Sequence, residues 1–161
     1  MVSHVYDTTY EVIQKNVDSV VLIDDSIVRG TTLEKSILQL LDKLSPKKIV
    51  IVSSAPQIRY PDCYGIDMSK MKEFVAFRAA LELLQERGME NILDEVNLRC
   101  LNAIENGTAD QENFVKAIYA PFTDDEISNK IAEIVKPKNL KAELAIVYQT
   151  VDNLHKACPN H

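Results

Sequence analysis

The sequence predicts an α/β protein with a parallel sheet, and three features of the chain point to this class. Two short, unbroken apolar runs have the pattern of strands that are covered on both faces. Between them, apolar residues recur at helical spacing and end at a Ser-Pro pair. The connections are short, so we expect parallel strands at 20–24 and 48–53, joined right-handedly by a helix at about 32–44.

Beyond residue 68 the pattern changes to helical stripes, two of which end at Gly88 and Gly107. Three spacings predict capping boxes at helix starts: Thr31 with Glu34, Thr108 with Gln111, and Thr123 with Glu126. The last and most regular stripe consists of Leu140, Leu144, Val147, Val151 and Leu154. We therefore predict two regions, an α/β part over residues 1–68 and an all-helical extension over residues 69–161.

The composition predicts a folded cytoplasmic protein. With 161 residues, of which 46% are apolar, the chain can form a core. No apolar run approaches the roughly 20 residues of a membrane-spanning helix, and the amino terminus lacks the pattern of a signal peptide. The net charge is −6, and the lysines are scattered along amphipathic stretches. We therefore expect neither a membrane nor a nucleic acid as partner.

The stretch from Asp24 to Thr32 carries the chemistry of the chain. Asp24 and Asp25 cannot both be buried unpaired, so they must lie at the carboxyl edge of the sheet, where open α/β folds bind ligands. Hydroxyls, an arginine and a glycine follow just before a helix, whose first N–H groups form an anion site. A phosphorylated ribose suits both the acid pair and the anion site, because it carries hydroxyls for the acids and a phosphate for the N–H groups. The alternative is a structural turn in which the acids bond to local backbone.

This motif, Asp-Asp-Ser-Ile-Val-Arg-Gly-Thr-Thr after an apolar strand, resembles the phosphoribosyl pyrophosphate (PRPP) motif of type I phosphoribosyltransferases. A second segment, Ser-Ala-Pro-Gln-Ile-Arg-Tyr-Pro-Asp-Cys-Tyr-Gly-Ile-Asp-Met at 54–68, is similar to the amidophosphoribosyltransferase family. The resemblance covers residues 18–96. It implies a partial type I phosphoribosyltransferase sheet, and the PRPP-binding portion of the enzyme that makes phosphoribosylamine from PRPP and glutamine-derived ammonia in the first step of purine synthesis.

The resemblance also implies roles for individual residues. The ribose and 5′-phosphate of PRPP would be bound by Asp24, Asp25, Ser26, Arg29, Gly30, Thr31 and Thr32. The acid pair would also hold the Mg²⁺ that accompanies the diphosphate, because this metal accepts one or two carboxylates together with water and phosphate oxygens. No catalytic group is expected within the chain. Arg59 and Asp67 are further candidates for ligand contact, with a solvated surface charge as the alternative for Arg59.

Some members of the family carry an iron–sulfur cluster, which needs several clustered thiolates. Here Cys63, Cys100 and Cys158 are widely spaced, and Asp62 takes the place of a cluster cysteine in the second segment. We expect plain thiols and no iron–sulfur cluster. The spacing also fits neither a disulfide framework nor a zinc knuckle.

In a complete member of the family, a glutaminase domain, further strands, a diphosphate loop and a mobile flap precede the PRPP motif. Here the motif begins near residue 20, so either the fold differs or the chain is a carboxyl-terminal fragment, inactive by itself, and we expect the fragment. The resemblance implies a homo-oligomer at full length, with purine nucleotides as feedback inhibitors. The alternative is a non-catalytic phosphoribosyltransferase-like regulatory module that senses PRPP or nucleotides.

Overall fold

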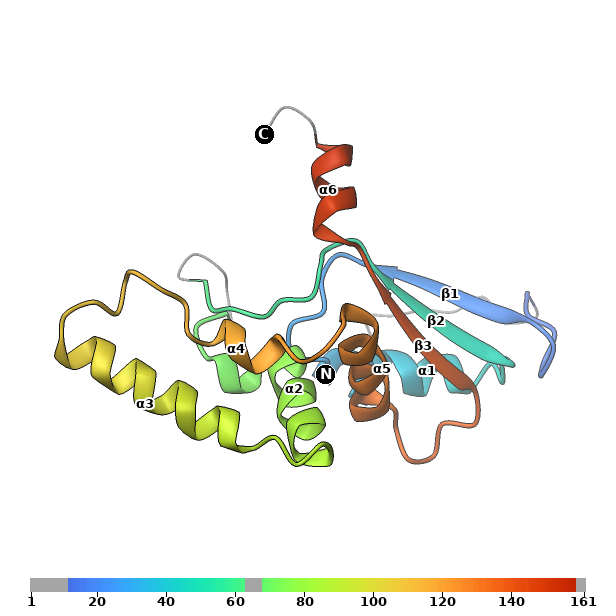
Figure 1. Cartoon of the computed structure of the whole chain (residues 1–161). Coiled ribbons are helices and arrows are strands. Elements are labelled where there is room, and N and C mark those ends of the chain that lie inside the picture. The colour runs from blue at the N-terminus through green and yellow to red at the C-terminus, as the bar shows by residue number, and fades with distance from the viewer. Residues whose placement is uncertain (1–11, 63–67, 159–161) are drawn as a thin grey trace.

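The computed structural model describes residues 12–62 and 68–158, and it contains a sheet of three parallel strands (Figure 1). The strands are β1 (Ser19–Asp24), β2 (Lys48–Ser53) and β3 (Glu143–Tyr148), in the order β1-β2-β3. Ser19 pairs with Lys48 and Asp24 with Ser53, so β1 and β2 are parallel neighbours. The predicted α/β class and its parallel β-α-β unit are confirmed.

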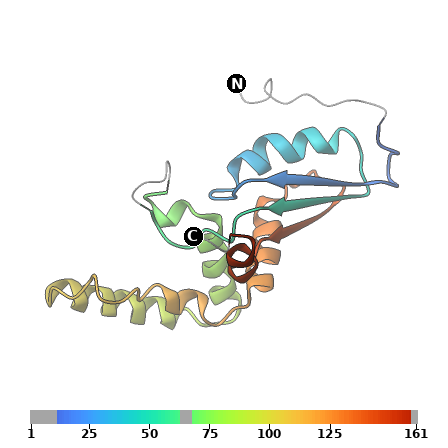
Figure 2. The same cartoon turned by 90° about the horizontal axis from the view of Figure 1, so that it is seen from above.

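Helices make up the remaining elements. They are the π-helical turn η2 (Leu33–Ile37), α1 (Leu38–Asp42), the 3₁₀ turn η3 (Met71–Glu73), α2 (Val75–Glu86), α3 (Asn91–Glu105), α4 (Lys116–Tyr119), α5 (Asp124–Val135) and α6 (Val151–Ala157). In Figure 1, α1 and α5 lie on one side of the sheet and α6 projects on the other. α3 extends away from the sheet in this view and in Figure 2. Within the described residues, no helix is long and apolar enough to cross a membrane.

The helix between β1 and β2 is close to its predicted position. Helical backbone runs from residue 31 to residue 42, and its first part is the π-helical η2. The predicted capping box of Thr31 and Glu34 is wrong. The Glu34 N–H donates to the carbonyl of Gly30 (3.0 Å), so the capping position falls one residue earlier, on a residue that has no side chain.

The region after residue 68 is mostly helical, but the prediction that it is all-helical was wrong. β3 lies within it and pairs with β2 in parallel over its whole length. The spacing of Leu144, Val147 and Val151 fits a helix locally, yet the first two belong to β3 and only the third begins α6. Pairing with β2 overrides the local pattern, because the open edge of β2 carries N–H and C=O groups that need partners.

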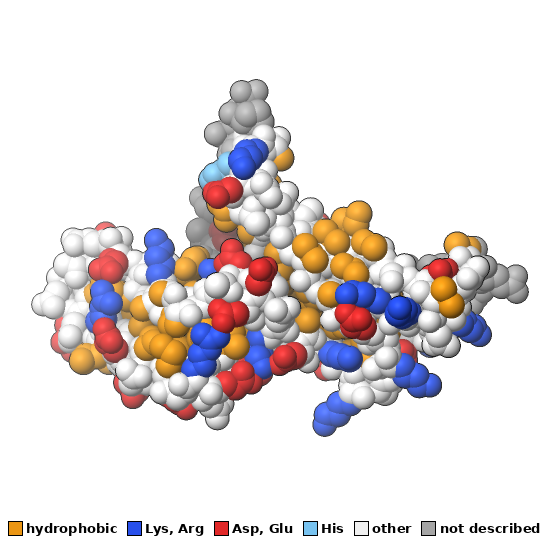
Figure 3. Space-filling model, turned by 45° about the vertical axis from the view of Figure 1, so that its right-hand side comes forward, with side chains coloured by type: hydrophobic (Ala, Val, Ile, Leu, Met, Phe, Trp, Pro, Cys, Tyr) orange, Lys and Arg blue, Asp and Glu red, His pale blue; other side chains and the backbone are white. Residues whose placement is uncertain are grey.

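One side of the sheet faces the core. Ile49 and Ile51 of β2 are fully buried and belong to the same core cluster as residues of α1 and α5. The core cluster contains residues of both predicted regions, and their division at residue 68 stays a prediction. On the opposite side of the sheet, Val21, Ile23 and Val147 are more than half exposed. Figure 3 shows hydrophobic side chains gathered on the surface beside the base of α6.

Glycines end α2 and α3 as predicted. Gly88 and Gly107 follow these helices with φ values of +64° and +67°, the left-handed conformation common after a helix. Beyond Gly107, the Thr108 N–H reaches back to the carbonyl of Ala103 (2.8 Å). Thr108 therefore closes α3 and opens no helix, so its predicted capping box with Gln111 is wrong.

The predicted capping box at the start of α5 is confirmed. The Glu126 N–H donates to Thr123 Oγ1 (3.2 Å), and the Thr123 N–H donates to Glu126 Oε2 (2.7 Å). Arg87, just after α2, also donates to the Glu126 carboxylate. The box therefore caps α5 and ties it to the end of α2.

Glu126 should make the stability of the fold depend on acid pH. The Thr123 N–H and then Arg87 lower the pKa of Glu126 from 4.5 to about 2. Because the folded-state pKa is depressed, this stabilisation is complete above pH 4.5 and is lost as the pH falls toward about 2. In urea unfolding between these pH values, Glu126→Gln should flatten the pH dependence of the unfolding free energy. Glu95→Gln, on the exposed surface of α3, should leave it unchanged, and equal profiles for the two variants would contradict the assignment.

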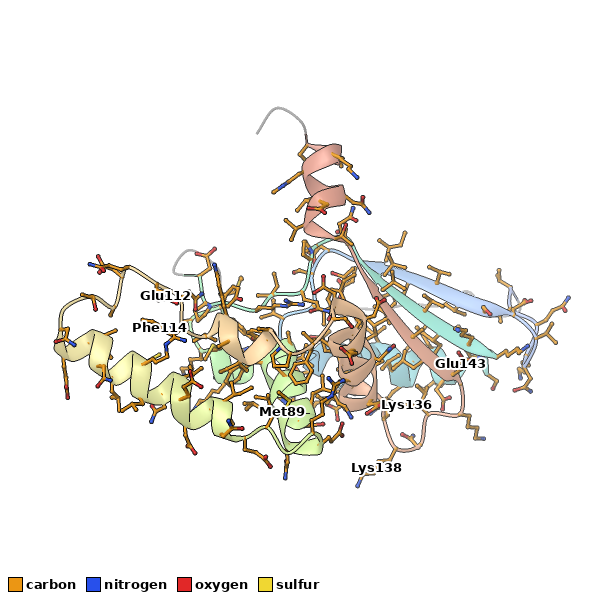
Figure 4. The ribbon with its side chains drawn as sticks, in the orientation of Figure 1. Met89, Glu112, Phe114, Lys136, Lys138 and Glu143 are labelled. Carbon is orange, nitrogen blue, oxygen red and sulfur yellow. The ribbon has the colours of Figure 1, made fainter. Side chains whose placement is uncertain are left out.

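The end of the sheet where the strands begin carries a charged pair. Lys48 donates to Glu143 (2.6 Å) between β2 and β3, and this bond lowers the pKa of Glu143 below its ordinary value. Figure 4 shows Glu143 at the start of β3, with Lys136 on the connection from α5. The acids and hydroxyls of the motif lie at the opposite end of the strands.

Candidate functional site

Asp24 and Asp25 lie at the carboxyl end of β1, as the sequence predicts. The Asp25 N–H donates to Asp24 Oδ1 (3.0 Å), and the Ser26 N–H donates to Asp25 Oδ1 (2.7 Å). The carbonyls of the two aspartates accept hydrogen bonds from the N–H groups of Ser54 (2.9 Å) and Ala55 (3.0 Å), just after β2. These bonds fix the turn that leaves β1 against the segment that leaves β2.

The loop after the acids surrounds a cavity of about 300 Å³. Its lining residues are Asp24, Ser26, Ile27, Val28, Arg29, Gly30, Thr31, Thr32 and Leu33. All the residues predicted to bind PRPP therefore lie around one cavity, except Asp25, which is exposed and outside the lining. Thr31 and Thr32 are exposed at the start of the helix, where the first N–H groups have no intrahelical partner. Hydroxyl and N–H donors in this arrangement are typical of an anion site.

The two acids differ in their surroundings. Burial raises the pKa of Asp24 above 3.8, the hydrogen bond from the Asp25 N–H opposes this, and the negative charge of Asp25 adds to the rise. A cation or a hydroxyl donor beside the pair would relieve the repulsion. The carboxylates suit Mg²⁺, yet no group of three or more His, Cys, Asp or Glu side chains in the described ranges could hold a metal. The pair would therefore hold a metal only together with ligand oxygens or water.

Gly30 is buried and adopts a left-handed conformation, with φ of +73°. A Cβ atom at this position would lie 2.6 Å from Val135 Cγ1 and 3.5 Å from Val75 Cγ2. Glycine is therefore required where the loop packs against the end of α5 and the start of α2. The close approach of Gly30 to a phosphate stays a prediction, and the contact with Val135 is a second reason for glycine that the sequence does not reveal.

Arg29 lines the cavity and also connects the loop to the segment before α2. Its guanidinium lies 2.5 Å from Glu73 Oε2, and both side chains are about one-third exposed (35% and 29%). Nearby, the Val75 N–H donates to the carbonyl of Val28 (2.8 Å). Partly exposed ion pairs contribute little to stability, so the pair with Glu73 does not prevent Arg29 from contacting an anion.

Arg59 lies outside the cavity, and its described contacts are with the protein. It forms an ion pair with Asp124, donates to Gln57 Oε1 (2.7 Å), and lies over the ring of Tyr119, 5.2 Å from its centroid. These contacts hold the segment after β2 against α4 and the start of α5.

Part of the second segment lies outside the described residues. This applies to Cys63 and Asp67, and to the Tyr-Gly-Ile between them. Of the described cysteines, Cys100 is half-buried and Cys158 is exposed. The expected absence of an iron–sulfur cluster stays a prediction.

One side chain at the same edge of the sheet, that of Tyr148, was not anticipated. In the register of the sheet, Asp24, Ser53 and Tyr148 form one row across the carboxyl ends of the three strands. Ser53 is 1% exposed and donates to the carbonyl of Ala55 (2.8 Å). The Tyr148 hydroxyl is buried, and burial together with the charge of Asp24 raises its pKa. The only sign of Tyr148 in the sequence was a tyrosine at the end of an apolar run. It was missed because that run was predicted to be a helix.

No protein-family model matches the chain, but individual relatives do. The chain is 41% identical over 96 residues to the amidophosphoribosyltransferase of Pasteurella multocida and 34% identical over 102 residues to that of Escherichia coli. It is 29% identical over 144 residues to the amidophosphoribosyltransferase of Saccharomyces cerevisiae. The three matches cover 59%, 63% and 83% of this chain. The chain spans less than a third of the length of these curated relatives, namely 18%, 20% and 28%.

The fold is α/β with a parallel sheet, and the motif that resembles the PRPP motif lies at its carboxyl edge. These features define the class as a partial type I phosphoribosyltransferase sheet. The three relatives reported above are all amidophosphoribosyltransferases. The chain is similar to part of amidophosphoribosyltransferase, and the predicted family resemblance is confirmed. The yeast match covers 83% of the chain, so the similarity continues past residue 96, where the resemblance seen in the sequence becomes weak.

Proposed function

We propose that this chain is the PRPP-binding portion of an amidophosphoribosyltransferase, which makes phosphoribosylamine from PRPP and glutamine-derived ammonia in the first step of purine synthesis. One observation carries the proposal: a cavity of about 300 Å³ is lined by Asp24 and by the motif residues from Ser26 to Thr32. The similarity to amidophosphoribosyltransferases supports the same reading. Homo-oligomerisation and inhibition by purine nucleotides belong to the proposal for the full-length protein.

Two groups of residues would bind different parts of PRPP. The 5′-phosphate would accept hydrogen bonds from the first N–H groups of the helix and from the hydroxyls of Ser26, Thr31 and Thr32, with Arg29 supplying positive charge. Asp24 and Asp25 would accept hydrogen bonds from the ribose hydroxyls. This arrangement keeps the acids away from the phosphate, which they would otherwise repel.

The chemistry needs binding groups rather than a nucleophile from this chain. When the bond between ribose and diphosphate breaks, positive charge develops on the sugar ring, as in glycoside cleavage. Fixing the 5′-phosphate and the ribose hydroxyls holds the ring in the geometry that an incoming ammonia requires. The carboxylates beside the ring would also stabilise its developing positive charge.

A magnesium ion is part of the proposal, and the donors present fit it. Asp24 and Asp25 would hold it, with phosphate and water oxygens completing its coordination. When bound, Mg²⁺ would neutralise charge on the departing diphosphate. Asp25 is the exposed member of the pair, and its side leaves room for such a shared site.

The phosphate site can be tested on the full chain by NMR titration with inorganic phosphate. Because the site depends on local backbone, we expect the amide signals of residues 29–33 to shift in a saturable manner. Ser26→Ala should weaken phosphate binding about fivefold, the effect of one lost hydrogen bond. Ser69→Ala, at an exposed position outside the cavity, is the matched control. Shifts confined to other residues, or equal affinities for the two variants, would contradict the proposed site.

We further propose that the chain alone binds PRPP weakly and does not turn it over. The motif supplies the sugar and 5′-phosphate contacts but no diphosphate loop. The alternative is a regulatory module that senses PRPP and takes no part in catalysis. The test replaces the corresponding segment of a complete amidophosphoribosyltransferase with this chain. The hybrid enzyme should keep PRPP-dependent activity if the proposal is right, whereas a module that only senses PRPP would abolish that activity.

A further inference from the structure

The hydroxyl of Tyr148 is buried at the carboxyl edge of the sheet, and it forms no hydrogen bond with any residue that the structure describes. Buried polar groups without partners destabilise a fold, so such a group calls for an explanation. The Tyr119 hydroxyl provides a contrast, because it donates to the carbonyl of Arg59 (2.9 Å). The explanation for Tyr148 lies in the residues beside it in the sheet.

Tyr148 and Asp24 lie in the same row, with Ser53 between them. Paired residues of a parallel sheet point to the same side, and the outer two are two strand spacings apart, roughly 10 Å between backbones. The central residue is small, and its hydroxyl is already engaged with the carbonyl of Ala55 (2.8 Å). The space between tyrosine and aspartate is therefore not filled by a large side chain from β2. The charge of Asp24 also reaches the Tyr148 hydroxyl electrostatically.

Asp24 has the capacity to accept this hydroxyl. Its Oδ1 accepts one hydrogen bond from the Asp25 N–H (3.0 Å), and a carboxylate offers about four acceptor positions. Asp24 also lines the loop cavity, whereas Tyr148 does not. A hydrogen bond from Tyr148 would therefore act on the ligand only through the position of Asp24.

We propose that Tyr148 is a positioning residue for Asp24. When the site holds PRPP, the tyrosine hydroxyl donates a hydrogen bond to the Asp24 carboxylate, directly or through one water, and fixes the carboxylate toward the ribose hydroxyls. The inference rests on the proposed function, because it requires a ligand that Asp24 contacts. Because Tyr148 belongs to β3, the inference also means that the region predicted to be a helical extension contributes a residue to the ligand site.

The test compares Tyr148→Phe with wild type in the full chain, using PRPP with Mg²⁺ and, separately, inorganic phosphate as probes in calorimetric or NMR titrations. The variant keeps the ring and removes the hydroxyl. PRPP affinity should fall about fivefold to tenfold, the effect of a hydrogen bond to a charged group. Phosphate affinity should not change, because it depends on the loop. The thermal midpoint should not fall, because the lost hydroxyl has no described partner.

Two controls separate positioning from a structural role. Tyr119→Phe loses a hydrogen bond within the fold, so it should lower the thermal midpoint and leave PRPP affinity unchanged. In an Asp24→Ala background, Tyr148→Phe should cause no further loss of PRPP affinity, because the two residues act through one interaction.

The outcomes distinguish the inference from the proposed function. If wild type binds PRPP and Tyr148→Phe binds it equally well, the inference is overturned and the proposed function stands. The inference is also overturned if Tyr148→Phe lowers PRPP affinity equally in the wild-type and Asp24→Ala backgrounds. It is likewise overturned if Tyr148→Phe lowers the thermal midpoint as much as Tyr119→Phe does. If the wild-type chain binds phosphate but no PRPP, the proposed function fails and the inference fails with it.

Discussion

Gly30→Ala should lower the free energy of unfolding by about 3 kcal/mol. A residue with a side chain pays roughly 1–2 kcal/mol for the left-handed conformation that Gly30 adopts, and overpacking a core costs roughly 1–3 kcal/mol. Both apply here, because the new Cβ would lie 2.6 Å from Val135 Cγ1. Urea unfolding followed by circular dichroism measures the loss.

Gly88→Ala is the matched control for this prediction. Gly88 has nearly the same conformation, with φ of +64°, but outside its immediate chain neighbours no atom lies within 4 Å of its Cβ position. Its replacement should therefore cost only the conformational part, about 1 kcal/mol. Val135→Ala should make room for the new methyl group, so the double variant with Gly30→Ala should lose less than the sum of the single changes. Equal losses for the two glycines would show that the contact with Val135 is unimportant.

Asp25→Asn should reduce turnover of PRPP at least about tenfold in a full-length amidophosphoribosyltransferase that contains this segment. The change removes a charge from the ribose and metal side, and tenfold corresponds to about 1.4 kcal/mol of transition-state stabilisation. The turn should persist, because asparagine Oδ1 can still accept from the Ser26 N–H, as Asp25 Oδ1 does at 2.7 Å. Steady-state kinetics with PRPP and Mg²⁺ as varied ligands measure the effect.

Glu95→Gln removes the same charge from the exposed surface of α3 and should leave these kinetics unchanged. Phosphate binding by the loop should survive in Asp25→Asn, because the acid lies outside the lining of the cavity. If Asp25→Asn had wild-type turnover, the acid pair would be a structural turn, and the proposed role of the motif would lose its chemical basis.

Local sequence was sufficient for elements whose causes lie nearby in the chain. β1 and β2 are compact apolar runs, and the capping box of Thr123 and Glu126 depends on residues three apart. Gly88 and Gly107 end their helices for a reason that is equally local. The acid pair could also be placed, because two adjacent carboxylates after an apolar strand cannot both be buried without partners.

The features that were missed depend on distant partners. β3 is a strand because β2 lies beside it. Its apolar run from Leu144 to Tyr148 also fits a strand, but the helical spacing that continues to Val151 and Leu154 favoured the wrong prediction. The contact between Gly30 and Val135 likewise joins parts of the chain that only the complete fold brings together. Tyr148 belongs to the row of Asp24 for the same reason, since its place depends on the register of the sheet.

The contact of Gly30 with Val135 also has a consequence for how the protein is made. During synthesis, the loop around Gly30 leaves the ribosome long before α5 and β3 exist, and domains generally fold as units once their parts are present. The loop and the first two strands must therefore wait until α5 and β3 have been translated, and until then the part of the apolar side of β2 that α5 covers stays exposed. A nascent chain stalled before residue 124 would contain the entire PRPP motif, and yet it would be a target for chaperones rather than a ligand-binding protein.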